Sequence, residues 1–157
     1  MGRGARQYYG MISLIDQCVG ALLALLERRG FLENTWIVYS SDHGEMLGDH
    51  GLMAKFNFYR ASAQVPLLLR PPDGRAGSVC DGLVELVDVP ATLLDAAGCD
   101  PLQASHGRSL LPATRGESVG RDSIVSEIQT HTRRTPAPTY RALRTQRYRY
   151  TLETESG

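Results

Sequence analysis

A run of β-branched and aromatic residues that breaks off into Ser-Asp-His-Gly constrains the fold of this 157-residue chain more than any other feature. Residues 35–40, Thr-Trp-Ile-Val-Tyr-Ser, have the composition of a buried β-strand, and Asp42, His43 and Gly44 follow closely. In open α/β sheets, ligands bind in the crevice outside the carboxyl ends of the strands. The sequence therefore predicts a strand that delivers a carboxylate and an imidazole into such a crevice.

The segments around this strand predict an α/β fold. Residues 9–29 carry apolar side chains at i, i+3, i+4 and i+7, which is typical of an amphipathic helix, and Gly30 suits its left-handed C-cap. The other expected elements are a short helix within 56–63, a second buried strand at 65–69, an element at 83–87 leading into a helix from Asp88 to Gly98, strands over 122–128 and 140–152, and a polar linker at 131–138.

The charge balance argues against nucleic acid and membrane as partners. Lys plus Arg and Asp plus Glu number 17 each, so no net charge attracts either one. Arginine and tyrosine interleave between residues 133 and 150, as in some nucleic-acid-binding segments, but an exposed strand explains this better at zero net charge. The apolar region 11–26 is interrupted by Asp16 and Gln17, and we expect it to be too short to span a bilayer.

The compartment is only weakly indicated. Three widely spaced cysteines form no CxxC pair and argue against a disulfide framework, which favours a reducing, cytoplasmic location. The amino terminus has no apolar core or cleavage pattern of a secretory signal. The localisation and the oligomeric state of the protein are otherwise not predicted.

Asp42, His43, His50 and Lys55 are the candidate functional residues. An isolated Asp-His pair is more often an ordinary loop feature, but here a second Asp-His pair at 49–50 and Lys55 follow behind a glycine-rich loop. A carboxylate and an imidazole together suit a divalent cation, and an ammonium suits the non-bridging oxygens of an anionic ester. His50 serves either as a general acid or substrate contact, or to order the loop, and we favour ordering.

Two adjacent ligands do not complete a metal site, because calcium takes about six to eight oxygen ligands. The other candidate carboxylates, Asp81, Asp88 and Asp95, occupy helix or turn positions and look structural. The remaining ligands are therefore expected from polypeptide outside this chain.

Motifs along nearly the whole chain combine into one family pattern. They are Ser-Asp-His-Gly-Glu-Met-Leu-Gly-Asp-His-Gly at 41–51 with Lys55, Val-Pro-Leu at 65–67, Val-Asp-Val-Pro-Ala-Thr-Leu-Leu at 87–94 and Gly-Arg-Ser-Leu-Leu-Pro at 107–112. Together they resemble the carboxyl-terminal half of a sulfatase of the arylsulfatase type, in the alkaline phosphatase superfamily. The resemblance implies a partial alkaline phosphatase-like α/β fold, in which residues 1–115 belong to the α/β domain and residues 116–157 begin a small antiparallel subdomain.

The resemblance also implies a set of roles. Asp42 and His43 would be two ligands of a divalent cation, usually Ca²⁺ and alternatively Mg²⁺ or Mn²⁺, and Lys55 would contact the sulfate. The substrate would be a sulfate ester, either a small molecule or a sulfated glycan, attacked by a formylglycine made from the Cys or Ser of a Cys/Ser-x-Pro-x-Arg motif. Relatives that hydrolyse phosphonate or phosphate esters use a similar segment, so that alternative stays open.

The sequence departs from the family pattern because it lacks that nucleophile motif. Cys99-Asp100-Pro101-Leu102-Gln103 comes nearest, but Gln103 stands where the arginine is required. We therefore expect a sulfatase fragment that carries part of the metal and sulfate site, has no formylglycine of its own and does not turn over in isolation. The rival interpretation is a non-catalytic remnant that folds only with a partner.

Overall fold

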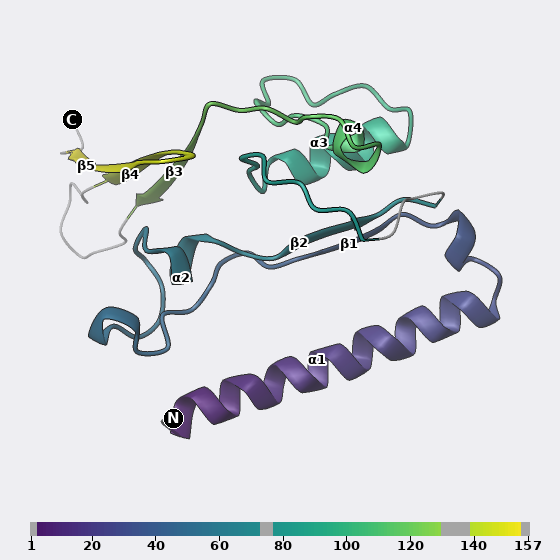
Figure 1. The fold of residues 1–157 in the computed structure, drawn as a ribbon, viewed down its shortest axis with the longest axis horizontal. Helices are drawn as coiled ribbons and strands as arrows, with labels where there is room; N and C mark the ends of the chain where they lie inside the picture. Colours follow the sequence, from purple (N-terminus) through teal and green to yellow (C-terminus); the bar gives the residue numbers. More distant parts are fainter. Residues whose placement is uncertain (1–2, 73–76, 130–138, 155–157) are drawn as a thin grey trace.

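The computed structural model describes residues 3–72, 77–129 and 139–154 (Figure 1). The helical elements are α1 (Arg3–Arg28), η1 (Leu32–Asn34), η2 (Asp49–Gly51), α2 (Arg60–Ala63), α3 (Asp88–Ala96) and α4 (Leu111–Thr114). The strands are β1 (Ile37–Ser40), β2 (Leu67–Arg70), β3 (Ser123–Gln129), β4 (Thr139–Thr145) and β5 (Arg149–Thr154). The predicted linker at 131–138 lies outside the described residues.

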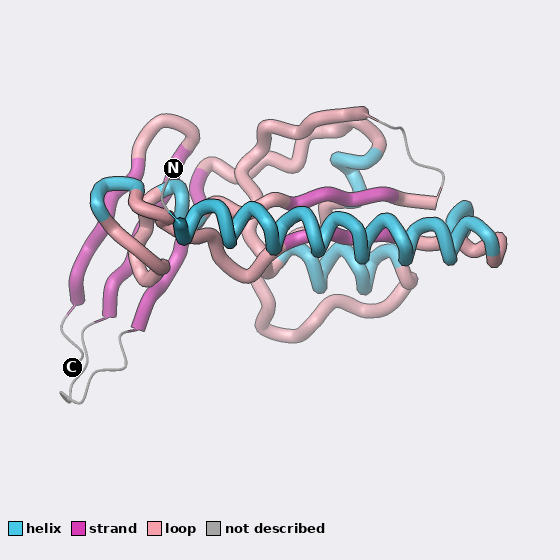
Figure 2. The backbone as a smooth tube through the Cα atoms, turned by 90° about the horizontal axis from the view of Figure 1, so that it is seen from below, coloured by secondary structure: helices cyan, strands magenta, loops and turns pink. Residues whose placement is uncertain are grey.

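The described elements form three layers and a separate small sheet. β1 and β2 pair antiparallel, with Val38 opposite Leu69 and Ser40 opposite Leu67. α1 runs along one face of this two-stranded sheet, and α3, α4 and their loops lie on the other face (Figures 1 and 2). β3, β4 and β5 form a three-stranded antiparallel sheet beyond the end of β1 and β2. The predicted α/β class with a small antiparallel sheet is confirmed, while the domain boundary at residue 115 stays a prediction.

The prediction that the first two strands are buried is wrong. Tyr39 lies opposite Leu68 in the register, and these side chains are 39% and 59% exposed. Among the described residues, β1 and β2 pair only with each other, so no further strand lies beside either of them.

Three further elements differ from prediction. Residues 83–87 form neither strand nor helix, because the Glu85 N–H donates to the nearby Asp88 carboxylate and the Glu85 carboxylate accepts from Arg121, so neither joins a strand ladder. The helix within 56–63 is shorter than expected, since Phe56 has a left-handed backbone with a φ of 68°. Residues 140–152 make two strands, because Thr145 and Tyr148 close a tight turn between them, with the Tyr148 N–H 2.9 Å from the Thr145 hydroxyl.

Helix α1 ends as predicted at Gly30, whose φ is +70°. The Gly30 N–H donates to the Glu27 carbonyl and the Phe31 N–H donates to the Leu26 carbonyl, both at 2.9 Å, the hydrogen-bond pair of a Schellman C-cap. Cys99 and Gly98 repeat this pattern after α3. The two glycine stops are therefore confirmed.

The expectation that the first apolar region is too short for a bilayer is wrong on length. From Gly4 to Arg28, α1 is long and apolar enough, by length and composition, to cross a membrane. The helix begins at Arg3, so it extends beyond the apolar region 11–26 on which the expectation was based. A helix surrounded by lipid is apolar on all sides, whereas helical spacing places Asp16, Gln17 and Glu27 together on one side of α1. The helix is therefore amphipathic.

The apolar side of α1 is wider than its contacts with the rest of the chain. Helical spacing places Met11, Leu14, Leu22 and Leu25 along one stripe, and these side chains are 55%, 60%, 55% and 42% exposed. The neighbouring stripe, which includes Leu23 and Leu26, is half-buried. α1 thus packs with one stripe and leaves a second apolar stripe open.

A buried ionic cluster holds α3, the loop before α4 and β3 together. Arg121 forms ion pairs with Asp88 and with Glu85, the latter at 2.5 Å, and the side chain of Arg121 is 9% exposed. The fully buried Asp88 also accepts hydrogen bonds from the backbone N–H groups of Glu85 and Arg108, each at 2.8 Å. Glu85 in turn accepts from the backbone N–H of Val125 in β3 at 2.9 Å. Every segment that meets at this point is therefore fixed through a carboxylate.

Replacing Arg121 with methionine should destabilise the chain by about 3–5 kcal/mol, because two carboxylates would stay buried without their cation. The measurement is urea unfolding followed by the fluorescence of Trp36, the only tryptophan. The control is Arg115→Met, which breaks an exposed pair with Glu117 and should cost at most about 1 kcal/mol. Equal unfolding midpoints for the two variants would contradict the structural role of Arg121.

Candidate functional site

The loop that carries the predicted site residues connects β1 to α2 and is held against α2 by Gly44. The Gly44 N–H donates to the Ser62 carbonyl at 2.7 Å. A Cβ atom on residue 44 would lie 1.9 Å from the Ala61 carbonyl oxygen, so only glycine allows this approach. Further along the loop, the Met46 N–H donates to the Ala54 carbonyl at 2.9 Å, which brings the residue before Lys55 beside Met46, three residues after His43.

The backbone of this loop is unusually strained. Leu47, His50, Ala54 and Phe56 have φ values of 48°, 55°, 65° and 68°, in the left-handed region that non-glycine residues rarely adopt. Such strain is sparse in proteins and collects at active sites and ligand clamps. Within the described chain, four of the five non-glycine residues with positive φ lie in this one loop. Sequence patterns missed this feature, because none of these residue types is typical of a left-handed backbone.

Asp42 and His43 point their side chains toward each other. Oδ2 of Asp42 lies 3.4 Å from Nε2 of His43, and their side chains are 84% and 41% exposed. The His43 backbone N–H donates to Asp42 Oδ1 at 2.9 Å. That hydrogen bond, more than the nearby imidazole and the Ser41 hydroxyl, lowers the pKa of the Asp42 carboxyl below its ordinary value. The carboxylate is therefore ionised and open to solvent at neutral pH.

The tautomer of neutral His43 follows from its other ring nitrogen. Nδ1 lies 2.9 Å from the Gly44 carbonyl oxygen, which can only accept a hydrogen bond, so Nδ1 carries the proton. Nε2 then carries the free lone pair, on the side of Asp42. Two ligands at right angles, each about 2.4 Å from one calcium ion, lie about 3.4 Å apart. The spacing of the two atoms therefore fits a shared cation.

Among the described residues, Asp42 and His43 are the side chains that could bind a metal at this position of the loop. No group of three or more His, Cys, Asp or Glu residues that could hold a metal occurs in the described ranges. The Asp42 carboxylate and the His43 imidazole therefore fit as two of the several ligands of a divalent cation, and they do not surround a cation by themselves.

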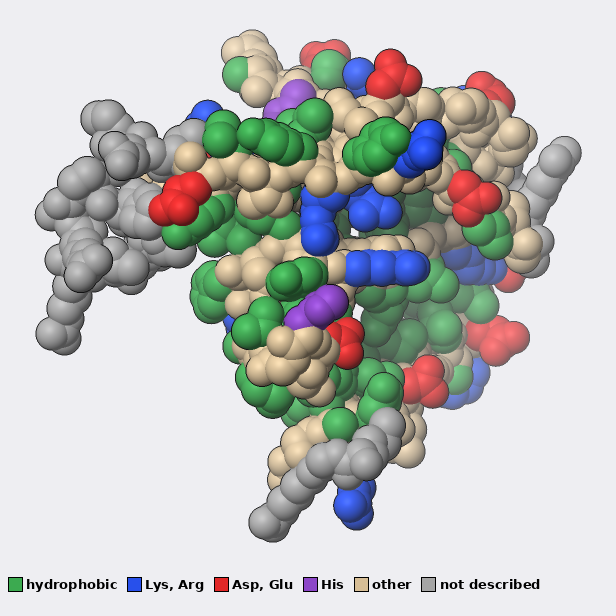
Figure 3. Space-filling model, turned by 60° about the vertical axis from the view of Figure 1, so that its left-hand side comes forward, with side chains coloured by type: hydrophobic (Ala, Val, Ile, Leu, Met, Phe, Trp, Pro, Cys, Tyr) green, Lys and Arg blue, Asp and Glu red, His purple; other side chains and the backbone are tan. Residues whose placement is uncertain are grey.

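Lys55 and His50 contact aromatic rings. Nζ of Lys55 lies 5.9 Å from the centroid of the Phe56 ring, and no ion pair of Lys55 occurs within the part of the chain that the structure describes. The His50 ring stacks on Tyr59 with 4.3 Å between centroids and 23° between planes. Figure 3 shows Lys and Arg side chains gathered in the middle of one face, next to a histidine and an acidic side chain.

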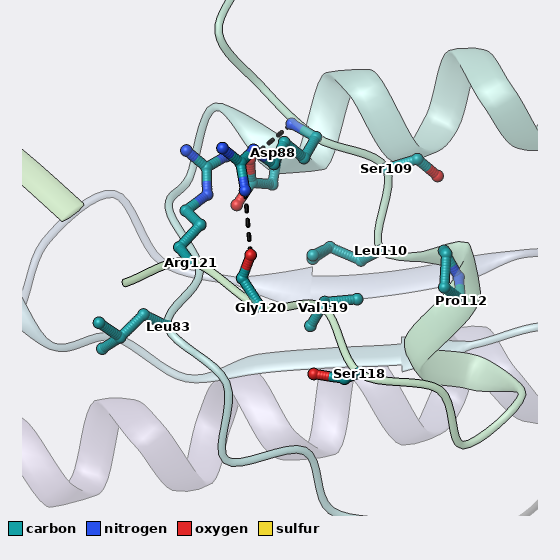
Figure 4. A pocket seen from close by; sticks show the side chains of 10 residues that line it. Leu83, Asp88, Ser109, Leu110, Pro112, Ser118, Val119, Gly120 and Arg121 are labelled. Atoms are coloured by element: carbon teal, nitrogen blue, oxygen red, sulfur yellow. Dashed lines mark hydrogen bonds and ion pairs between the residues drawn. The ribbon is translucent and has the colours of Figure 1, made fainter. Parts of the chain in front are cut away.

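A pocket of about 220 Å³ lies at the buried ionic cluster, away from this loop. Figure 4 shows Arg121 and Asp88 side by side at one end, and Pro112 at the other. Arg108, which also lines the pocket, donates a 3.0 Å hydrogen bond to the Gly120 carbonyl. Asp88 and Arg121 form an ion pair at this pocket, so their charges contribute to the fold. Asp88 has the structural role that the sequence predicted for it.

Comparison with known proteins gives a family match. The family model described as Sulfatase matches residues 3–99. Arylsulfatase K from Homo sapiens is 41% identical over 105 residues, which cover 67% of this chain and 20% of that protein. Choline-sulfatase from Rhizobium meliloti is 39% identical over 117 residues, which cover 73% of this chain and 23% of that protein.

Solved structures give the same result at the level of the fold. A protein solved in complex with its substrate D-glucosamine-2-N,6-O-disulfate superposes with a TM-score of 0.78 and 28% identity, covering 92% of this chain and 32% of that one. The phosphonate monoester hydrolase of Agrobacterium radiobacter superposes with a TM-score of 0.77 and 26% identity, covering 94% and 34%. This chain thus spans about a fifth of its curated relatives and about a third of these solved structures.

Replacing Gly44 with alanine should destabilise the chain by about 1–3 kcal/mol, because the new methyl group would collide with the Ala61 carbonyl. The matched control is Gly20→Ala in α1, where no atom lies within 4 Å, and which should stabilise by up to about 1 kcal/mol. Opposite shifts of the urea midpoint are expected. Two shifts of the same sign would refute the close contact of residue 44 with α2.

Proposed function

This chain belongs to the sulfatase family, and from that premise we propose that it supplies the part of a sulfuric ester hydrolase that holds a divalent cation and contacts the sulfate. The observation that carries the proposal is the 3.4 Å spacing between Asp42 Oδ2 and His43 Nε2, with Nδ1 of His43 bonded to the Gly44 carbonyl. Asp42 and His43 would be two ligands of Ca²⁺, with Mg²⁺ and Mn²⁺ as alternatives, and other polypeptide would supply the rest. A cation bound there would neutralise charge on the sulfate oxygens.

Lys55 is proposed as the residue that binds a non-bridging oxygen of the sulfate. Its ammonium has no carboxylate partner among the described residues, so its charge is available to an anion. The hydrogen bond between Met46 and Ala54 holds the residue before Lys55 beside Met46, three residues after His43. A charge stabiliser placed in this way lowers the free energy of the transition state more than that of the substrate.

His50 is proposed to order the loop and not to transfer a proton. The stacking of its ring on Tyr59 supports this role, because a stacked ring in a strained backbone fixes the segment between His50 and Lys55. The substrate is proposed to be a sulfate ester of a small molecule or a glycan. Since the sequence contains no Cys/Ser-x-Pro-x-Arg motif, we also propose that the isolated chain has no turnover.

Hydrolysis of a phosphonate or phosphate ester is the second candidate, favoured by the likeness to the phosphonate monoester hydrolase. The two candidates separate in a chimera, in which this chain replaces the matching region of the Rhizobium meliloti choline-sulfatase. Faster hydrolysis of 4-nitrophenyl sulfate than of phenyl phosphonate or phosphate esters supports the sulfatase proposal. The reverse order supports the alternative.

Asp42→Asn should weaken calcium binding to this chain by more than about tenfold, because the amide removes the ligand charge while keeping the size. Calcium titration followed by the NMR signals of the His43 ring measures the effect. Asp49→Asn, in the second Asp-His pair, is the matched control and should leave the titration unchanged. An identical loss in both variants, or none in Asp42→Asn, would exclude Asp42 as a ligand.

Lys55→Ala in the chimera should lower kcat by about 10²–10³, the usual cost of losing one charge stabiliser at the reacting group. Calcium affinity should not change, because Lys55 is not a ligand. Lys55→Arg keeps the charge and should recover part of the rate. If kcat for 4-nitrophenyl sulfate stays at the unsubstituted value in Lys55→Ala, the sulfate contact is refuted.

A further inference from the structure

The open apolar stripe of α1 has a spacing that is the same in both directions along the helix. Counted from Cys18, Leu14 and Leu22 are four residues away on either side, and Met11 and Leu25 are seven residues away. Steps of three and four residues keep all five side chains on one side of a helix, and α1 is a single helix over these positions. The stripe is therefore palindromic, with Cys18 at its centre.

The stripe faces solvent along its whole length. Leu14 and Leu22 are 60% and 55% exposed, and Cys18 is an exposed free thiol. Seen from below in Figure 2, α1 lies in front of the other described elements from end to end. A second helix that approached from this side would therefore meet α1 before any other described element.

Polar residues end the stripe at equal distances from its centre. Gln7 and Arg29 lie eleven residues before and after Cys18, and both are exposed. The Arg29 N–H donates to the Leu25 carbonyl at 3.0 Å, so helical hydrogen bonding reaches this position. An exposed apolar patch with a polar border is typical of a protein interaction surface.

The surface of the whole chain is large enough for such an interface. The chain exposes 11865 Å², which is about 4,000 Å² more than a self-contained protein of its mass exposes. Obligate homodimers bury about 2,000–5,000 Å² in total, about half of it from each copy. The excess in one copy therefore exceeds what a stable dimer requires from it.

The charges of α1 favour a protein partner over a lipid surface. Helices that lie in a membrane interface carry Lys and Arg along their polar side. The sequence has no Lys or Arg between Arg6 and Arg28, and Asp16 and Gln17 occupy the polar side in the middle of the helix. The polar side of α1 thus lacks the cations that anionic lipid head groups would bind.

We propose that α1 joins two copies of this chain in a symmetric, antiparallel homodimer, with Cys18 on the two-fold axis. In a two-fold interface each copy uses the same patch, and a palindromic stripe matches itself only when the second helix runs in the opposite direction. Leu14 of one copy then lies opposite Leu22 of the second copy, and Met11 lies opposite Leu25. The antiparallel arrangement also places the two helix dipoles in opposite directions, which is electrostatically favourable.

The first test is the oligomeric state of the intact chain in reducing buffer, measured by sedimentation equilibrium, and a dimer is expected. Leu14→Glu should raise the Kd of the dimer by at least about a hundredfold, because each copy would bury a carboxylate against a leucine. The matched control is Ser13→Glu, at an exposed neighbour whose hydroxyl bonds to the Tyr9 carbonyl. It lies on the polar side and should change the Kd less than about threefold. An unchanged helical circular dichroism signal verifies the fold of both variants.

A mixture of two variants tests the direction of the helices. Leu14→Glu and Leu22→Lys should each weaken their own dimer. When the two are mixed, the new carboxylate of one copy faces the new ammonium of the other, and the mixed dimer should be at least about tenfold tighter than either dimer alone. In a parallel pair each residue faces its own equivalent, so mixing would gain nothing.

Cross-linking tests the position of the two-fold axis. With Cys80→Ser and Cys99→Ser, only Cys18 remains, and a short bismaleimide should give a covalent dimer in high yield. The matched control keeps Cys99, another exposed thiol, and carries Cys18→Ser and Cys80→Ser. It should stay uncoupled, because Cys99 lies outside α1.

The inference is overturned if the intact chain is monomeric, if Ser13→Glu weakens the dimer as much as Leu14→Glu, or if mixing recovers nothing. A monomer that binds vesicles of phosphatidylcholine and phosphatidylserine, and loses them in Leu14→Glu, would make a lipid surface the occupant. A monomer whose Cys18 reacts freely with a thiol reagent, but is protected in the choline-sulfatase chimera, would make the host polypeptide the occupant.

Discussion

The contact between Gly44 and the carboxyl-terminal end of α2 is the constraint on which the geometry of the site depends. The Asp-His segment leaves β1 at an open sheet edge, where nothing in the strand itself would fix its direction. One short backbone hydrogen bond to Ser62, at a distance that excludes any side chain on residue 44, fixes it against α2. α2 in turn follows directly on the segment that contains Lys55 and Phe56, so the backbone segments on both sides of the loop lead to the same short helix.

Local patterns in the sequence predicted the elements whose structure is determined locally. The 3.6-residue spacing and Gly30 defined the body and the end of α1, and the motif around residues 41–51 identified the site loop and the family. Burial was not predictable in the same way, because whether Tyr39 and Leu68 are covered depends on strands that residues 35–40 and 65–69 do not contain. The positive φ values of Leu47, His50, Ala54 and Phe56 have no sequence pattern either, because these residue types rarely adopt a left-handed backbone.

The ionic cluster shows the same division between local and long-range information. Asp88 was recognised as a structural residue from its helix-start position, but its partner Arg121 lies 33 residues away in a loop-rich stretch with no periodicity. Glu85 was assigned to a regular element, and instead its carboxylate bonds to Arg121 and to β3. Such long-range hydrogen bonds from side chains, in place of backbone hydrogen bonds between strands, can be found only from coordinates.

The surface of the described fold is larger than its mass requires. The chain exposes 11865 Å², whereas a self-contained protein of 17.2 kDa exposes about 7,800 Å². The open stripe of α1 and the exposed side chains of Tyr39 and Leu68 account for part of this excess. The solved structures described above are about three times as long as this chain.

The stack of His50, Tyr59 and Arg149 has a mechanical consequence. It links His50, at the tip of the site loop, to Arg149 on β5, so the loop and the C-terminal sheet are in direct contact through these side chains. Tilting the sheet would pull on the loop through the guanidinium group, and a rotation of the loop would turn the sheet. Moving the sheet without the loop would therefore require breaking the contact between Arg149 and Tyr59.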